Sequence, residues 1–162
     1  MKTKISLLFV SLLCACSFSS DGYDDLSACP KVQIRQEDRA IVQKVAGEDL
    51  FKIEMIGYKG HCYFDERVQK NKAAVAPRFK IVRLRNSNVE DVHFSYYLET
   101  FEGPTRFLGQ KTYFAAARMP KGSYEMYYSP EFGELSVPAG EYDFDMYAGL
   151  KAITQDSEYK VK

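Results

Sequence analysis

Residues 92–99 read Val-His-Phe-Ser-Tyr-Tyr-Leu-Glu, and this stretch alternates in polarity without a break. Every second position is strongly apolar, namely Val92, Phe94, Tyr96 and Leu98. Successive side chains of a β-strand point to opposite faces. The stretch therefore predicts a strand with one face in a core and one polar face.

The same two-residue period recurs along the chain, at residues 51–55, 112–118, 124–128 and 141–146. Turn-forming residues such as Gly103-Pro104 separate these segments. The motif Leu-x-Val-Pro-Ala-Gly-x-Tyr at 135–142 resembles the tyrosine corner of immunoglobulin-like domains. Together these patterns predict a mainly β fold, an antiparallel immunoglobulin-like β-sandwich.

A short N-terminal helix is predicted over residues 36–46. Ile41, Val42 and Val45 share one helical face there, and Gly47 follows as a candidate C-cap. Farther along the chain, alternation predicts that Tyr124, Met126 and Tyr128 face the core from a strand.

Two irregularities are also expected in the strands. Gly57 and Gly60 predict a turn before the segment at 61–64. A β-bulge is predicted near residues 81–82, because it lets Arg83 and Arg85 reach solvent.

The first fifteen residues have the composition of an export signal. Two lysines precede an apolar run at residues 5–13, and Leu-Cys-Ala-Cys follows at 13–16. The last four residues resemble a bacterial lipobox, which implies cleavage before Cys16, lipidation of its thiol and acylation of the new amino terminus. A transmembrane anchor is disfavoured because a spanning helix needs about 20 apolar residues. A soluble secretory signal is the stronger alternative.

The organisation that follows is a signal at 1–15, a polar lipidated tether at 16–28 and one domain at 29–162. Ser17, rather than an aspartate, follows the lipidated position, which by analogy indicates the outer membrane.

The chain carries 22 Lys+Arg and 22 Asp+Glu. This balance argues against nucleic-acid binding, which requires a basic face.

The cysteine content is also consistent with an exported protein. After Cys14 is removed and Cys16 is lipidated, Cys29 and Cys62 remain. In an exported protein these two predict one disulfide, with two free thiols as the alternative. No Cys-x-x-Cys motif is present, and neither a metal site nor a cofactor is predicted.

Several short motifs resemble a family of small exported alphaproteobacterial lipoproteins. They are Cys29-Pro30-Lys31-Val32, Gly60-x-Cys62, Tyr113-Phe114-Ala115-Ala116 and Gly149-Leu150-x-x-x-Thr154 with Glu158-Tyr159. The resemblance implies a lipoprotein and supports pairing of Cys29 with Cys62. It implies no reaction, cofactor or catalytic residue.

Candidate chemistry is sparse. His93 and Ser95 share one strand face, but same-face neighbours lie about 7 Å apart and no Gly-x-Ser-x-Gly motif accompanies them. Within an aromatic-rich stretch, alternation leaves Tyr127 and Phe132 as candidate exposed contacts.

These features predict a non-enzymatic lipoprotein at the periplasmic face of the outer membrane. We expect it to act through an envelope protein partner in assembly or maintenance. The alternative is a binding module for a small amphiphile or a glycan, inside or beside the sandwich, and an enzyme ranks third.

Overall fold

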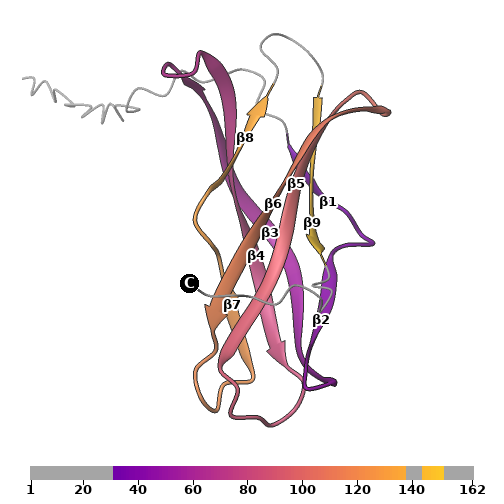
Figure 1. Ribbon diagram of the computed structural model, residues 1–162, viewed down its shortest axis with the longest axis vertical. Helices are drawn as coiled ribbons and strands as arrows, with labels where there is room; N and C mark the ends of the chain where they lie inside the picture. The colour runs from indigo at the N-terminus through magenta and orange to yellow at the C-terminus, as the bar shows by residue number, and fades with distance from the viewer. Residues whose placement is uncertain (1–30, 138–143, 152–162) are drawn as a thin grey trace, which may run out of the picture.

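The computed structural model describes residues 31–137 and 144–151, and these ranges contain nine strands and no helix. In chain order the strands are β1 (Val32–Ile34), β2 (Ala40–Val45), β3 (Glu48–Asp65), β4 (Lys70–Arg83), β5 (Asp91–Glu102), β6 (Arg106–Arg118), β7 (Glu125–Tyr128), β8 (Gly133–Val137) and β9 (Phe144–Lys151). They form two layers that pack face to face (Figure 1). The predicted mainly antiparallel β-sandwich is therefore confirmed.

The first layer, sheet A, has the strand order β1-β9-β5-β6. Its strands are antiparallel except β1, which runs parallel to β9. The second layer, sheet B, contains β2-β3-β4, and β4 pairs on its far side with both β8 and β7. β8 covers residues 71–75 of β4 and β7 covers residues 79–82.

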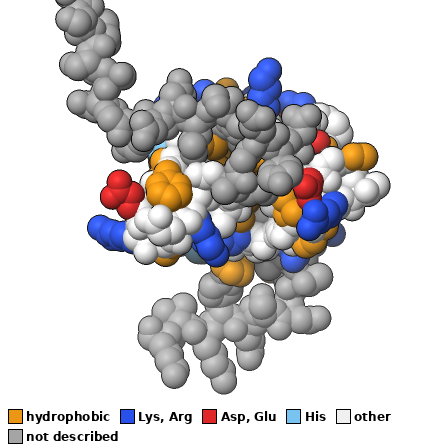
Figure 2. All heavy atoms as spheres, turned by 90° about the horizontal axis from the view of Figure 1, so that it is seen from above, with side chains coloured by type: hydrophobic (Ala, Val, Ile, Leu, Met, Phe, Trp, Pro, Cys, Tyr) orange, Lys and Arg blue, Asp and Glu red, His pale blue; other side chains and the backbone are white. Residues whose placement is uncertain are grey.

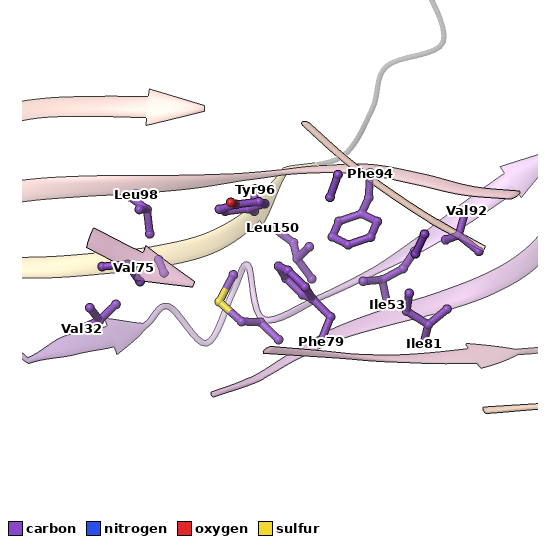
Figure 3. Packing of buried hydrophobic residues seen from close by; sticks show 14 of the residues in the cluster. Val32, Ile53, Val75, Phe79, Ile81, Val92, Phe94, Tyr96, Leu98 and Leu150 are labelled. Carbon is purple, nitrogen blue, oxygen red and sulfur yellow. The ribbon is translucent and has the colours of Figure 1, made fainter. Parts of the chain in front are cut away.

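The core between the sheets is built from the inward faces of β5 and β9 on one side and β3 and β4 on the other. Figure 3 shows Phe79 of sheet B lying against Phe94 of sheet A, with the ring centroids 4.7 Å apart. Tyr96 stacks on Tyr113 at 5.2 Å. The four apolar residues of the 92–99 stretch are all buried here, as predicted. Edge-on and stacked rings add geometric specificity to this burial.

The predicted helix over residues 36–46 is wrong. Residues 40–45 form β2, which pairs with β3 and places Ile41 opposite Ile53. β-Branched side chains favour strands. Ile41 and Val45 pack against the core, whereas Val42 has the opposite parity and is exposed. Ala46 and Gly47, with φ of 52° and 83°, form a two-residue hairpin turn rather than a helix cap.

The predicted turn at Gly57 and Gly60 is also wrong. β3 runs through both glycines, and a register shift between Met55 and Gly57 absorbs the irregularity. The chain reverses instead after Asp65, where Gln69 has a φ of 53°.

The predicted bulge at residues 81–82 does not form, because the β3–β4 register is continuous there. Arg83 consequently points inward and is buried. Its guanidinium donates to the carbonyl oxygens of Ser123 (3.2 Å), Ser87 (3.0 Å) and Val89 (2.6 Å) and lies over the ring of Phe51. Hydrogen bonds to loop carbonyls therefore replace the contacts with water that were expected for Arg83.

Tyr124 was expected in the core, but it precedes β7 and is exposed. Its strand neighbours Met126 and Tyr128 do pack against the core, as predicted. Several predicted features lie outside the described residues: the signal, the tether at 16–28, Cys16, Cys29 and Tyr142 of the predicted tyrosine corner.

In the view from above, basic and acidic side chains are interspersed around the rim, in keeping with the balanced charge (Figure 2).

Candidate functional site

The outer face of sheet A carries a set of polar side chains that are held by contacts far apart in sequence. After β1 the chain makes a turn at residues 35–39 that stays against β9. Arg35 N–H donates to the carbonyl of Ala148 at 3.0 Å, and Leu150 N–H donates to the carbonyl of Asp38 at 2.7 Å. These two bonds bring the side chains of Arg35 and Asp38 to residues of β5, beyond the intervening β9.

Asp38 is bound to Tyr97 of β5. The Tyr97 hydroxyl donates a hydrogen bond to Asp38 Oδ2. Gly149 of β9 lies beneath them, and a Cβ there would approach the Tyr97 oxygen to 2.6 Å. Burial, together with this hydrogen bond, raises the pKa of the Tyr97 phenol, so the group stays protonated and acts as a donor at neutral pH.

Arg35 is bound to Glu99, two positions along β5. The guanidinium and carboxylate form an ion pair in which the Glu99 side chain is only 9% exposed. The hydrogen bond to Glu99 raises the pKa of Arg35. Gln110 of β6 donates to the other carboxylate oxygen of Glu99 at 3.3 Å.

The Arg35 guanidinium also lies over a row of aromatic rings. Its central carbon is 4.5 Å from the ring centroid of Tyr147 and 5.6 Å from that of Phe101. Phe101 in turn contacts Tyr147 at 5.7 Å and Phe107 at 5.4 Å, and Phe107 is 55% exposed. We call Phe101, Phe107 and Tyr147 the aromatic strip.

A hollow of about 420 Å³ opens beside these groups. The described residues that line it are Arg35, Glu37, Asp38, Tyr97, Glu99, Gln110, Leu150 and Lys151. We call it the sheet A pocket. Its polar groups are planar carboxylates, a guanidinium and an amide, which are suited to binding a ligand through several directed hydrogen bonds.

His93 and Ser95 lie on the same face but do not join the sheet A pocket. His93 is exposed, whereas Ser95 is buried and its hydroxyl donates to the carbonyl of Lys151 at 3.3 Å. Neither is among the described residues that line the pocket.

Tyr127 and Phe132, the predicted contact residues, are 60% and 49% exposed on sheet B. Tyr127 lies opposite Lys80 in β4 and donates to Glu125 at 2.9 Å. Phe132 packs edge-on against His61 at 5.2 Å and directly precedes Gly133, which lies opposite Val75. At about 3.3 Å per residue, the positions of Tyr127 and Phe132 are roughly 13 Å apart along β4. The structure thus places both on the surface without bringing them together.

Cys62 lies in β3 and is half-buried against the core. Its predicted partner Cys29 is outside the described residues, so the pairing stays a prediction.

Sequence reasoning missed most of the sheet A pocket. It placed Tyr97 and Glu99 on a polar face and expected that face to be solvated, whereas both side chains are buried. The sequence shows that Tyr97 and Glu99 are polar and share one strand face, but it does not show which residues bind them. Arg35 and Asp38 went unnoticed because their turn was assigned to, or lay next to, the predicted helix.

Comparisons with protein-family models, with curated proteins and with solved structures find no match for this chain. Among the described residues, no helix is long and apolar enough to cross a membrane. Within the same ranges, no group of three or more His, Cys, Asp or Glu side chains is placed to hold a metal ion.

Proposed function

We propose that this chain is a non-enzymatic lipoprotein of the bacterial envelope that acts by binding a protein partner in envelope assembly or maintenance. A lipid on Cys16 would hold it at the periplasmic face of the outer membrane, and a Cys29–Cys62 disulfide would brace the domain. The likeness to small alphaproteobacterial lipoproteins belongs to the same proposal. A triacylated anchor supplies more than the marginal attachment that one chain gives.

The observation that carries the binding role is the exposure of three aromatic side chains within residues 124–132, in the β7–β8 part of sheet B. Tyr124, Tyr127 and Phe132 are each about half exposed or more. Tyrosine and phenylalanine are enriched in protein interfaces because they bury large areas at low entropic cost. Several such side chains along one sheet edge favour a protein contact over isolated surface exposure.

Site-specific photocrosslinking in cells tests this proposal. A photoreactive amino acid at position 127 or 132 should crosslink the same envelope protein. Val42, which is 48% exposed on β2 at the other edge of sheet B, provides the control position. The Cys16→Ser variant, which removes the anchor, should lose the crosslink. Equal crosslinking from positions 42, 127 and 132 would overturn the proposal.

A second function is favoured by the sheet A pocket. The core between the sheets is occupied by side chains from both layers, which favours a ligand beside the sandwich over an amphiphile within it. Of the two ligand classes considered from the sequence, the polar lining of the sheet A pocket suits the glycan.

A further inference from the structure

We infer that the outer face of sheet A binds a neutral saccharide, with hydroxyl groups in the sheet A pocket and a ring face on Phe107, the exposed end of the aromatic strip. This inference deepens the second function proposed above and is independent of the protein-binding role of Tyr127 and Phe132. Arg35 connects the two parts of this face: it forms an ion pair with Glu99 in the pocket, and it lies over Tyr147 of the aromatic strip.

The polar half is held in place by contacts within the protein. Glu99 is held between Arg35 and Gln110, and Asp38 is held by Tyr97. A carboxylate has about four acceptor sites, so each of these two retains capacity after its internal bonds. Because the groups are fixed in advance, a ligand would not bear the entropic cost of ordering them.

The shape of these groups matches neighbouring hydroxyls. Carboxylates, guanidinium and carboxamide are planar and present pairs of acceptors or donors. Two adjacent hydroxyl groups on a sugar ring can bond to such a pair at once. The volume of about 420 Å³ falls within the usual range for small-ligand pockets.

The apolar half supplies the second requirement of saccharide binding. A pyranose ring has an apolar C–H face that packs on aromatic rings. The Arg35 guanidinium already covers the Tyr147 ring at 4.5 Å, so the ring open to a sugar is Phe107 at the far end of the strip, which is 55% exposed. A short oligosaccharide could therefore contact polar groups at one residue and Phe107 at another.

The charges of the pocket disfavour other ligand classes. Three carboxylates, from Glu37, Asp38 and Glu99, face two cations, from Arg35 and Lys151. The net negative charge opposes an anionic ligand such as a phosphate or a fatty acid. The positive charge of Arg35 is already paired with Glu99, so it is not available to bind an anionic group.

Saturation-transfer NMR on the full mature lipoprotein in detergent tests the inference. Two neutral probes distinguish the source of the saccharide: chitopentaose, which is built from the N-acetylglucosamine that peptidoglycan contains, and cellopentaose as a glycan foreign to the cell wall. Transfer to chitopentaose alone would indicate a cell-wall sugar as the source. Transfer to both would indicate a general saccharide site. Either result supports the inference.

Matched variants locate the site. Phe107→Ala and Gln110→Ala remove exposed side chains on sheet A, and each should weaken binding by about tenfold. Phe132→Ala removes an exposed aromatic from sheet B and should change affinity by less than about twofold. Circular dichroism and urea unfolding confirm that each variant is folded.

Two results would overturn the inference: no transfer to either glycan at millimolar concentration, or binding that both sheet A variants leave unchanged. The photocrosslinking result at positions 127 and 132 is unaffected by either outcome. Failure of the saccharide site and failure of the protein-binding role are therefore separable.

Discussion

The hydroxyl of Tyr97 donates a hydrogen bond to Asp38 across Gly149, a position in β9 that has no room for a side chain. An alanine Cβ at 149 would lie 2.6 Å from the Tyr97 oxygen and 2.7 Å from Asp38 Cβ. We expect Gly149→Ala to lower the free energy of unfolding by about 1–3 kcal/mol, measured by urea denaturation. Gly109→Ala in β6, where no atom lies within 4 Å, is the matched control. Equal losses from both would contradict the close-packing argument.

The hydrogen bond itself can be separated from the packing. Tyr97→Phe keeps the ring and removes the donor, whereas Asp38→Ala removes the acceptor. We expect a coupling of about 1 kcal/mol between the two changes in a double-mutant cycle of unfolding free energies. Strictly additive effects would show that the bond contributes nothing to stability.

The buried Arg83 should matter far more than its exposed neighbour Arg85. Arg83→Leu leaves three loop carbonyls without their donor, and we expect a loss of about 2–4 kcal/mol in unfolding free energy. Arg85 makes an exposed ion pair with Glu48, so Arg85→Leu should cost less than about 1 kcal/mol. Thermal and urea unfolding of both variants would measure the difference. Similar losses of unfolding free energy would refute the proposal that Arg83 stabilises the fold by binding the loop carbonyls.

Alkaline pH should weaken the fold through its buried tyrosines. Burial raises the pKa of Tyr113 to about 12 and also raises that of Tyr96. In the unfolded chain these phenols ionise near pH 10, so their contribution is intact below about pH 10 and falls as pH rises toward 12.

Urea midpoints measured between pH 8 and 12, with tyrosinate absorbance followed in parallel, test this expectation. Tyr113→Phe removes one of the titrating groups and should make the alkaline decline shallower. An unchanged slope would show that Tyr113 does not contribute to it.

The predicted disulfide has a direct chemical test. Peptide mapping without reductant should recover a crosslinked fragment containing Cys29 and Cys62. A closed loop of 34 residues is worth roughly 3–4 kcal/mol in the chain-entropy model, so reduction should lower the melting temperature clearly. Cys29→Ala should show the same low value with and without reductant. Recovery of both peptides with free thiols would refute the pairing.

The sandwich could be predicted because alternation is a local property. Phe94 and Tyr96 needed only their immediate neighbours to be assigned to a buried face. The prediction for β2 was wrong because Ile41, Val42 and Val45 share a helical face, whereas in the strand Val42 points to the opposite side from the other two and is exposed. The predicted exposure of Arg83 was wrong because its guanidinium donates to loop carbonyls, and no local sequence pattern reveals those acceptors.

The pocket could not be predicted for a related reason. Arg35 and Glu99 are 64 residues apart, and they meet only because β1 pairs with β9 and β9 pairs with β5. A single sequence contains no signal for such an encounter. Exposure of Tyr127 and Phe132, in contrast, followed from alternation and the adjacent turn.

The position of β9 between β1 and β5 sets the order in which the domain can assemble. Sheet B can form its β2-β3-β4 meander as those residues become available, but β1 has no partner in sheet A until β9 arrives more than a hundred residues later. Pairing over such a separation is slow, since a long loop must close before any contact rewards it. A chain emerging amino terminus first therefore cannot complete its polar cluster on sheet A until residues 144–151 are free. The last described strand therefore controls when sheet A, and with it the sandwich core, can be completed.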